Sequence, residues 1–478
     1  MSDGMQPMHA TGKPAQMLAH RLTPMPNSLW KACRLEPKDF AMLRIQTAFS
    51  ITEPALPLAQ RFAHVRRQTE RLVKPLSAED CQLQSMPDAS PAKWHLAHLT
   101  WFFETFVLER FETHFKPFDS SFRTLFNSYY NGVGDKYPRP RRGLISRPSL
   151  EDVLAYRRQV DARVQEVIAS GGDADRTELA QLIELGLHHE QQHQELLLTD
   201  IQHALSFNPQ QPAYADRWPL TSTAPQPLRW HAYNGGLEQH GFSASQDGAF
   251  AFDNETPRHP AYIAPFELAS RLTTNGELMG FIDDAGYQRP ELWLAMGWDW
   301  VQTGQHRLPL YWQGEVGSYR HFTLQGLLAV DPNTPACHLS YFEADAVARW
   351  AGARLPTEFE WEHAARQLPA PGIKAGNFVE MAAFHPLPQQ LASLEAPAQM
   401  MGDVWEWTQS NYNPYPGYRP WEGLVGEYNG KFMCNQFVLR GGSCATPQSH
   451  IRASYRNFFP PDAQWQFSGL RLARDPGR

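Results

Sequence analysis

The sequence changes character at a proline-rich stretch near the middle of the chain. Residues 207–229 contain five prolines, and the two sides of this stretch follow different patterns. Before it, from about Leu56, apolar residues recur with the 3.6-residue period of helices. After it, the apolar runs are short and broken by Gly, Pro, Asn and Asp. Since one hydrophobic core seldom grows beyond ~250–300 residues, the 478-residue chain is expected to be multi-domain, with a linker at 207–229.

Helix boundaries are marked in the first half. Ser90 followed by a proline is typical of a helix start, with serine as the N-cap and proline at the first helical position. This start leads into residues 92–111, which are rich in Leu, Trp and Phe. Ser149 and Asp152 form the pattern of a capping box, which predicts another helix near 150–169.

Two further helices complete a bundle. One begins near Leu56, and another spans roughly residues 177–204. Four helices with one long connection, residues 112–148, predict an all-α four-helix bundle over 51–206. This fold builds metal sites from side chains on facing helices. Residues 1–50 carry little periodicity and are expected to be an extension of uncertain structure.

The second half, residues 230–478, is expected to be an irregular α+β domain. Its short runs contain many Trp and Tyr residues and are bounded by turn residues. Helices are predicted near 340–351 and 357–367.

Composition argues against several functions. The net charge is −7 and no basic stripe stands out, which disfavours a nucleic-acid partner. No window approaches ~18 consecutive apolar residues, so a membrane span is not expected. The five cysteines are odd in number and scattered, which is typical of a protein in the reducing cytoplasm.

The strongest chemical signal is a pair of histidines on the last helix of the bundle. His189 and His193 are four residues apart, so both imidazoles project from one helix face and can bind one ion. The third ligand is predicted to be His98, carried inward by an apolar helix. Glu195 lies about 200° around the helix from His193, which suits a supporting or surface role. His95 is expected to be structural or to support a ligand.

The histidine pair has competing interpretations. It is also a literal H-E-x-x-H, the zinc metalloprotease pattern in which Glu190 is the general base. A third possibility is a solvated stretch of helix rich in His, Gln and Glu. Three imidazoles leave up to three positions open on an octahedral ion, which suits Fe(II) handling a substrate and O₂ together. The geometry does not fix the metal.

Several motifs of the chain resemble a known family. Residues 90–98 and 188–195 look like the DinB-like bundle of the sulfoxide synthases of ergothioneine biosynthesis, the hercynine oxygenases. The second half is similar to the formylglycine-generating-enzyme (FGE-sulfatase) fold, which is related to C-type lectins. The segments that carry this second resemblance are residues 354–362 (RLPTEFEWE), 402–408 (GDVWEWT), 439–443 (LRGGS) and 467–471 (FSGLR). The two resemblances together cover about residues 55–474.

The resemblance implies an activity and a metal. The metal is iron(II), held by His98, His189 and His193. The reaction joins a cysteine sulfur to imidazole C2 of hercynine, consumes O₂ and gives the sulfoxide. Gln192 and Asn457 match positions that contact hercynine.

The trimethylammonium group of hercynine suits an aromatic pocket through cation–π contact. Phe458, Phe459 and Trp465 are near Asn457 in sequence, and ordinary aromatic core is the alternative.

The long connection between helices resembles the branch of the family that uses free cysteine. Tyr129 and Tyr130 match its tyrosine pair, in which one tyrosine supplies a proton or an electron, and Tyr129 is the first choice here. Arg139 and Arg142 are candidates to hold the cysteine carboxylate by bidentate pairing. A solvated basic loop is the alternative.

Two departures refine the prediction. Phe459 stands where the branch that uses γ-glutamylcysteine has an aspartate, which favours free cysteine. Cys444 follows the Gly-Gly-Ser motif without the close cysteine pair of true formylglycine-generating enzymes, which disfavours their copper chemistry. Remaining rivals are a γ-glutamylcysteine or selenium donor, a zinc hydrolase or thiol transferase on the same bundle, and a non-catalytic binding module.

Overall fold

The computed structural model describes residues 56–170, 176–215, 220, 222–248, 250–369, 372–390, 396–421, 426 and 429–477. The extension expected at residues 1–50 lies outside the described residues. None of the helices in the described ranges is both long and apolar enough to cross a membrane.

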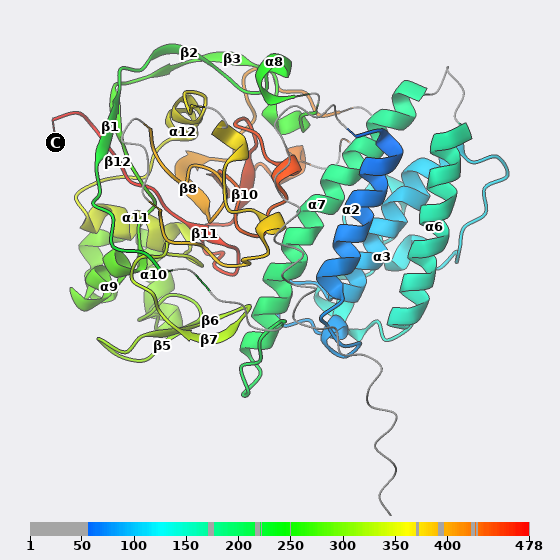
Figure 1. Cartoon of the computed structure of the whole chain (residues 1–478), viewed down its shortest axis with the longest axis horizontal. Helices are drawn as coiled ribbons and strands as arrows, with labels where there is room; N and C mark the ends of the chain where they lie inside the picture. Colours follow the sequence, from blue (N-terminus) through cyan, green and yellow to red (C-terminus); the bar gives the residue numbers. More distant parts are fainter. Residues whose placement is uncertain are drawn as a thin grey trace, which may run out of the picture. The chain divides into compact units, whose positions relative to one another are not determined.

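The first half is a helical bundle. Its four main helices lie side by side, and α7 is on the side of the bundle nearest the strands (Figure 1). The α-helices of this half are α2 (Leu58–Val73), α3 (Ala92–Phe103), α4 (Glu109–Phe111), α5 (Phe122–Leu125), α6 (Leu150–Ser170) and α7 (Arg176–Ser206). Helix α3 packs against α6 and α7, and α2 packs against α7 and α6.

The starts of α3 and α6 differ from each other. At α6, Ser149 and Asp152 form the expected reciprocal hydrogen bonds, with the Asp152 N–H donating to Ser149 Oγ at 3.2 Å. At α3 the predicted serine cap is wrong. Pro91 occupies the N-cap position, and the N–H of Ser90 donates instead to Asp200 of α7 at 2.8 Å. The backbone N–H of Ser90 is therefore paired with a side chain of another helix and not within a local capping motif.

Helices α3 and α7 approach closely at a glycine. A Cβ on Gly186 would lie 2.6 Å from Cε1 of Phe103 and 2.9 Å from Cε1 of Phe102, so only glycine allows this spacing. Just beyond Phe103, α3 runs into one π-helical segment, η2 (Glu104–Leu108), before α4. Such π-helical turns are frequently found at functional sites.

The second half combines four small sheets with short helices. Its α-helices are α8 (Ala244–Asp247), α9 (Asn275–Asp283), α10 (Ala295–Gly304), α11 (Tyr341–Trp350) and α12 (Glu358–Ala365). Its strands are β1 (Trp230–Tyr233), β2 (Gly236–His240), β3 (His259–Ile263), β4 (Phe266–Ala269), β5 (Trp312–Gln313), β6 (Arg320–Thr323), β7 (Gly326–Ala329), β8 (Trp405–Asn411), β9 (Phe437–Arg440), β10 (Asn457–Phe459), β11 (Ser468–Gly469) and β12 (Ala473–Arg474).

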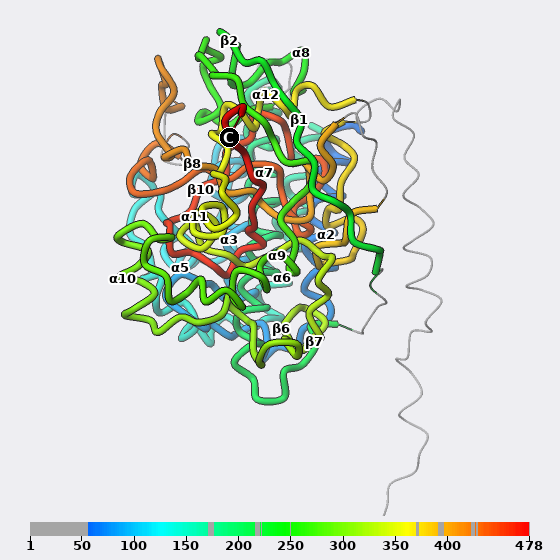
Figure 2. The backbone as a smooth tube through the Cα atoms, turned by 90° about the vertical axis from the view of Figure 1, so that its left-hand side faces the viewer, coloured from blue at the N-terminus to red at the C-terminus, as the bar shows by residue number. Residues whose placement is uncertain are grey.

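Most strand pairs in this half are antiparallel. The sheets have the orders β1-β4-β12, β10-β9-β8-β11, β2-β3 and β5-β6-β7, and the pair β8–β11 is parallel. The chain ends beside the first of these sheets, as the red trace in Figure 2 shows. Both helices predicted here are present, because Ser340 and Thr357 begin α11 and α12 with capping boxes.

Buried ion pairs give structural roles to charged residues of the segments RLPTEFEWE and GDVWEWT. Glu358 at the start of α12 accepts hydrogen bonds from Arg440 at 2.8 Å and from Arg456 at 2.9 Å. Arg471 reaches Glu406 at 2.8 Å in the same core. These pairs join α12 to β9 and to the residue before β10, and join β8 to the segment between β11 and β12.

Candidate metal centre

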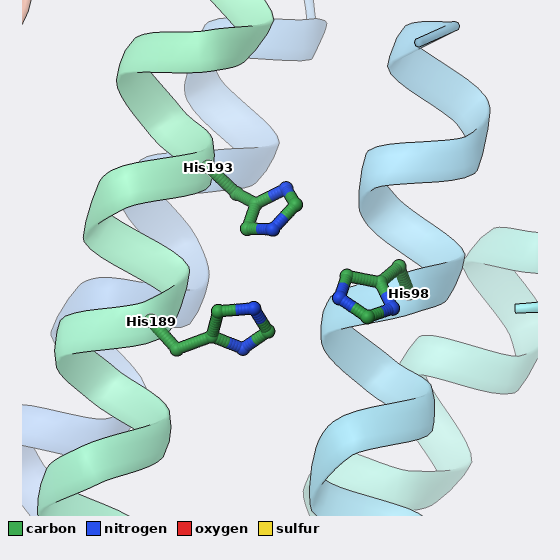
Figure 3. Close-up of side chains that lie close together, drawn as sticks. All are labelled: His98, His189 and His193. Atoms are coloured by element: carbon green, nitrogen blue, oxygen red, sulfur yellow. The ribbon is translucent and has the colours of Figure 1, made fainter. Parts of the chain in front are cut away.

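Three imidazoles meet between α3 and α7. His98 projects from α3 towards His189 and His193, which are one turn apart on α7 (Figure 3). One ring nitrogen from each lies within 4.8 Å of the others. The ring centroids of His98 are 5.0 Å from those of both His189 and His193. This is the set of three residues predicted from the sequence, brought to one point.

The three imidazoles are buried and neutral. Their exposed fractions are 0% for His98, 1% for His189 and 9% for His193. Burial lowers the pKa of all three, to about 3 for His189 and well below the usual value for the other two. Each ring therefore keeps a lone pair, which is the form that binds a metal.

The tautomer of His98 is set by its neighbour. Its Nδ1 donates to the carbonyl oxygen of Phe126 at 2.7 Å, so Nε2 is the unprotonated nitrogen. Within the described part of the chain, this buried Nε2 has no hydrogen-bond partner. A buried acceptor without a donor is costly, and a metal ion at the centre of the triad removes that cost. The residues therefore fit a metal site.

A chain of hydrogen bonds orients His193. Its Nδ1 lies 2.7 Å from Nδ1 of His95, and Nε2 of His95 lies 3.1 Å from Oδ2 of Asp200. With the His95 Nε2–H donating to the carboxylate, Nδ1 of His95 accepts a hydrogen bond from the Nδ1–H of His193. This leaves Nε2 of His193 for the metal. Carboxylate–histidine chains of this kind commonly fix metal ligands.

Glu190 does not take part in the site. Its carboxylate accepts hydrogen bonds from Arg66 and Thr69 of α2, at 2.8 and 2.6 Å, and from Arg157 of α6. Burial alone would raise the pKa of Glu190, and the charges of Arg157 and Arg66 bring it down to about 2. A carboxylate held this way on the far side of α7 cannot serve as the base of a zinc protease.

Glu195 is also fully engaged, but with the second half of the chain. Oε1 accepts the indole N–H of Trp405 at 2.7 Å and the hydroxyl of Ser443 at 2.5 Å, and Oε2 accepts the hydroxyl of Thr446 at 2.7 Å. The surface role considered for Glu195 is therefore wrong. Trp405 of the segment GDVWEWT and Ser443 of the segment LRGGS both donate to this carboxylate.

The residues predicted to contact hercynine come from both halves of the chain. Gln192 of α7 donates to the hydroxyl of Tyr455 at 2.7 Å, and its Oε1 is buried without a partner among the described residues. Asn457 is half-buried in β10, where its Oδ1 accepts the N–H of Phe458 at 2.9 Å. Phe458 stacks on Tyr412 with ring centroids 4.0 Å apart.

Phe459 and the two arginines differ in their surroundings. Phe459 packs against Trp465, with ring centroids 6.0 Å apart. Arg142 is buried, with its guanidinium 3.4 Å from the ring centroid of Trp94 and Nη1 donating to Ser90 at 2.9 Å. Arg139 is exposed and pairs with Asp88, so the structure does not bring Arg139 into the site.

The tyrosine pair connects to the triad through one tryptophan. Tyr129 stacks on Tyr130 with centroids 4.8 Å apart, and Tyr130 lies 5.7 Å from the ring of Trp101. Trp101 in turn stacks on His98. Lys431 reaches across from the second half and donates to the carbonyl oxygen of Tyr129 at 2.6 Å.

Sequence reasoning missed the two tryptophans that flank His98. Trp94 stacks on one face with a centroid distance of 4.6 Å, and Trp101 on the other at 5.4 Å. They are four residues before and three after His98, which is the spacing of neighbours on one helix face. That spacing was available in the sequence as a signal. The contacts of Lys431 and Glu195 were not, because they join residues far apart in the chain.

A helical bundle with three clustered histidines, hydrogen-bonded to a sheet-rich domain, defines a two-domain protein with a candidate metal centre. Family models match both parts: the DinB superfamily over residues 61–197, and the sulfatase-modifying factor enzyme 1-like domain over 233–394 and 397–476. The fold class predicted from the sequence is confirmed.

Curated relatives give the family. The chain is 31% identical over 443 residues to the hercynine oxygenase of Mycobacterium tuberculosis, covering 87% of this chain and 98% of the relative. It is 31% identical over 458 residues to that of Mycolicibacterium thermoresistibile, covering 88% and 95%. The chain belongs to the hercynine oxygenase family.

The second half alone also matches formylglycine-generating enzymes. The protein of Streptomyces coelicolor is 28% identical over 274 residues, covering 47% of this chain and 82% of the relative. The cysteines that the structure describes, Cys81, Cys337, Cys434 and Cys444, are free thiols. Burial raises the pKa of Cys444 well above its usual value, so this thiol stays protonated.

Proposed function

We propose that this chain is an iron(II)- and O₂-dependent sulfoxide synthase. It joins imidazole C2 of hercynine to the sulfur of a thiol and yields the sulfoxide. The single observation that carries this proposal is the neutral, buried triad of His98, His189 and His193 in a chain that aligns with hercynine oxygenases over almost their whole length. Iron, when bound there, supplies positions for O₂ and for a thiol, which a metal deprotonates.

Hercynine is expected to lie between α7 and β10. Gln192 offers a buried carbonyl oxygen that no described group satisfies, and Asn457 is half-buried on the facing strand. The imidazole of hercynine has an N–H for such an acceptor. Phe458 supplies an aromatic ring near Asn457 that suits the trimethylammonium cation.

We propose free L-cysteine as the thiol donor. Phe459 has no carboxylate to bind the amino group of a dipeptide, and its ring packs against the indole of Trp465. Arg142 is the better candidate for the cysteine carboxylate, because it is buried beside the ligand helix, whereas Arg139 is turned to Asp88. Tyr129, with Tyr130 beside it, supplies the proton or electron.

The remaining parts of the proposal concern the binding partners and the cellular compartment. The substrates are hercynine, cysteine and O₂, and neither nucleic acid nor membrane is part of the proposal. The proposed compartment is the reducing cytoplasm, which suits the free thiols of the described residues.

The test is turnover under controlled oxygen. Protein purified without oxygen and loaded with Fe(II) is expected to consume O₂ only when hercynine and a thiol are both present. Competing cysteine, γ-glutamylcysteine and a selenium donor, with products separated by mass spectrometry, identify the donor. Absence of a C–S or C–Se product with all three donors would sink the proposal. Activity with one zinc and no oxygen would favour a hydrolase or transferase instead.

A further inference from the structure

The ring of His98 is stacked between two indoles of its own helix. Trp94 lies on one face at an interplanar angle of 12°, and Trp101 on the other at 19°. Both indoles are almost fully buried, with exposed fractions of 2% and 0%. Either ring could therefore pass an electron to an oxidant at the metal through the imidazole.

The two indoles differ in how readily they lose an electron. The guanidinium of Arg142 lies 3.4 Å from the ring centroid of Trp94, so a cation radical there would place two positive charges in contact. Trp101 has no described cation over its ring. Both indole N–H groups donate to a carbonyl oxygen, that of Trp101 to Arg123 at 3.2 Å and that of Trp94 to Leu125 at 3.4 Å, so the cation is what distinguishes the two rings. Trp101 is the easier of the two to oxidise.

Beyond Trp101 the contacts continue outward. Tyr130, with an exposed fraction of 1%, lies 5.7 Å from the Trp101 ring and 4.8 Å from the ring of Tyr129. Tyr129 is only partly buried. The Nζ of Lys431 is 4.7 Å from the Tyr129 ring centroid, and its charge favours loss of the phenolic proton once the ring is oxidised. The four rings form a continuous path from the metal site to a partly exposed residue.

We propose that Trp101 is an electron relay that lets oxidising equivalents leave the metal site along Tyr130 and Tyr129 when no substrate is bound. This inference rests on the proposed function for its oxidant, which O₂ or hydrogen peroxide forms at Fe(II). One electron passes from Tyr129 through Tyr130 and Trp101 to that oxidant, which is reduced by one electron. Tyr129 releases its phenolic proton to solvent and becomes a neutral phenoxyl radical. The relay spares His98 and the other ligands from oxidation.

The experiment uses the full chain loaded with Fe(II) and mixed with hydrogen peroxide, without hercynine or thiol. Samples frozen at short times are examined by electron paramagnetic resonance, and longer incubations by peptide mass spectrometry. The wild type is expected to give a tyrosyl signal and oxidation at Tyr129. Trp101→Phe is expected to lose most of that signal and to carry more oxidation on His98, His189 or His193.

Trp94→Phe is the matched control, because it removes the other indole stacked on the same ligand. It is expected to retain the wild-type radical yield. A Trp101→Phe protein that keeps the wild-type yield, or a Trp94→Phe protein that loses it equally, overturns the proposal. Bound iron and the circular dichroism spectrum are measured on both variants.

A second variant covers the case in which Trp101→Phe does not fold. Tyr129→Phe combined with Tyr130→Phe leaves the metal site and Trp101 untouched, and is expected to replace the tyrosyl signal by a tryptophanyl one. An unchanged tyrosyl signal would contradict the relay. Because no substrate is present, these results stand apart from turnover: failure to form the C–S product overturns the proposed function without changing the radical spectra.

Discussion

The indole N–H of Trp405 donates a 2.7 Å hydrogen bond to Oε1 of Glu195, joining the second half of the chain to the helix that carries the metal pair. Glu195 is two residues beyond His193, and both hydroxyls of Ser443 and Thr446 donate to the same carboxylate. These three hydrogen bonds therefore join the part of α7 next to His193 to β8 and to the segment after β9.

Replacing Glu195 by Leu is expected to leave three buried donors without an acceptor. At ~1–3 kcal/mol for each unsatisfied group, the free energy of unfolding should fall by at least about 3 kcal/mol. Glu195→Gln keeps one acceptor oxygen and should lose clearly less. Urea unfolding followed by tryptophan fluorescence measures both; equal losses for the two variants would contradict this role.

Glu190→Gln is expected to damage stability more than metal binding. The change removes the charge that Arg157 and Arg66 share, although Arg66 keeps its pair with Asp161 at 2.7 Å, and breaking a buried ion pair from one side costs ~3–5 kcal/mol. The folded fraction should still bind one metal per chain. The opposite pattern, full stability with loss of a hydrolytic activity, would identify Glu190 as a catalytic base. Chemical denaturation and metal analysis of the same samples distinguish the two.

His98→Ala is expected to abolish stoichiometric iron binding, since it removes the only ligand from α3. His95→Ala should weaken iron affinity by ~10–100-fold, the usual effect of removing a residue that orients a ligand. Competition with a coloured chelator measures both affinities. His203→Ala, a change elsewhere on α7, serves as the control and should bind iron as the wild type does. Stoichiometric iron in His98→Ala would refute the ligand assignment.

The metal-free protein is expected to lose stability as the pH falls below 6.5. Burial lowers the folded-state pKa of His98, His189 and His193, so the unfolded chain binds protons that the folded chain refuses. Stability is then fully present above pH 6.5 and falls towards the lowered folded values. At pH 5.5 the three groups together cost up to about 4 kcal/mol.

Denaturant unfolding of metal-free protein at pH 7.5 and 5.5 measures this loss. Other buried histidines, such as His188 and His450, add to the total loss because burial lowers the pKa of both. His98→Leu removes one group and should reduce the difference between the two pH values by up to about 1.4 kcal/mol. The same pH difference in wild type and variant would show that other groups cause it.

Phe459→Asp is expected to shift donor preference towards γ-glutamylcysteine. A carboxylate at this position can bind the amino group of the dipeptide, and a hydrogen bond to a charged group is worth ~1.5–3 kcal/mol, or roughly 10- to 150-fold in relative kcat/KM. Competition assays with both thiols measure the ratio. Phe459→Asn has similar size without the charge and should change it little; an unchanged ratio in Phe459→Asp would place this residue away from the thiol.

The features that the sequence and the structure share rest on local spacing or on whole motifs. The His189–His193 pair and the capping box at Ser149 depend on residues a few positions apart, and the helical geometry brings them together without outside help. The order of a bundle followed by the sheet-rich motifs was sufficient to identify the family and the fold class.

The features that failed or were missed depend on contacts between distant segments. The N–H of Ser90 donates to Asp200, 110 residues away, so the local sequence pattern predicted the wrong N-cap residue. Glu190 is held by Arg66 and Arg157, 124 and 33 residues away, which no spacing rule reveals. Arg139 and Arg142 are three apart in one basic loop, yet only the fold buries one and exposes the other.

Gly186 affects the geometry of the candidate metal centre because it has no side chain. It lies one turn before His189, at the point where α7 touches Phe102 and Phe103 of α3. Any larger residue would push the two helices apart and widen the gap that His98 must cross. Glycine in a helix costs ~1 kcal/mol relative to alanine, so the close approach is retained against helix propensity. The spacing of the two backbones that carry His98 and His189 is thus limited by the absence of one side chain.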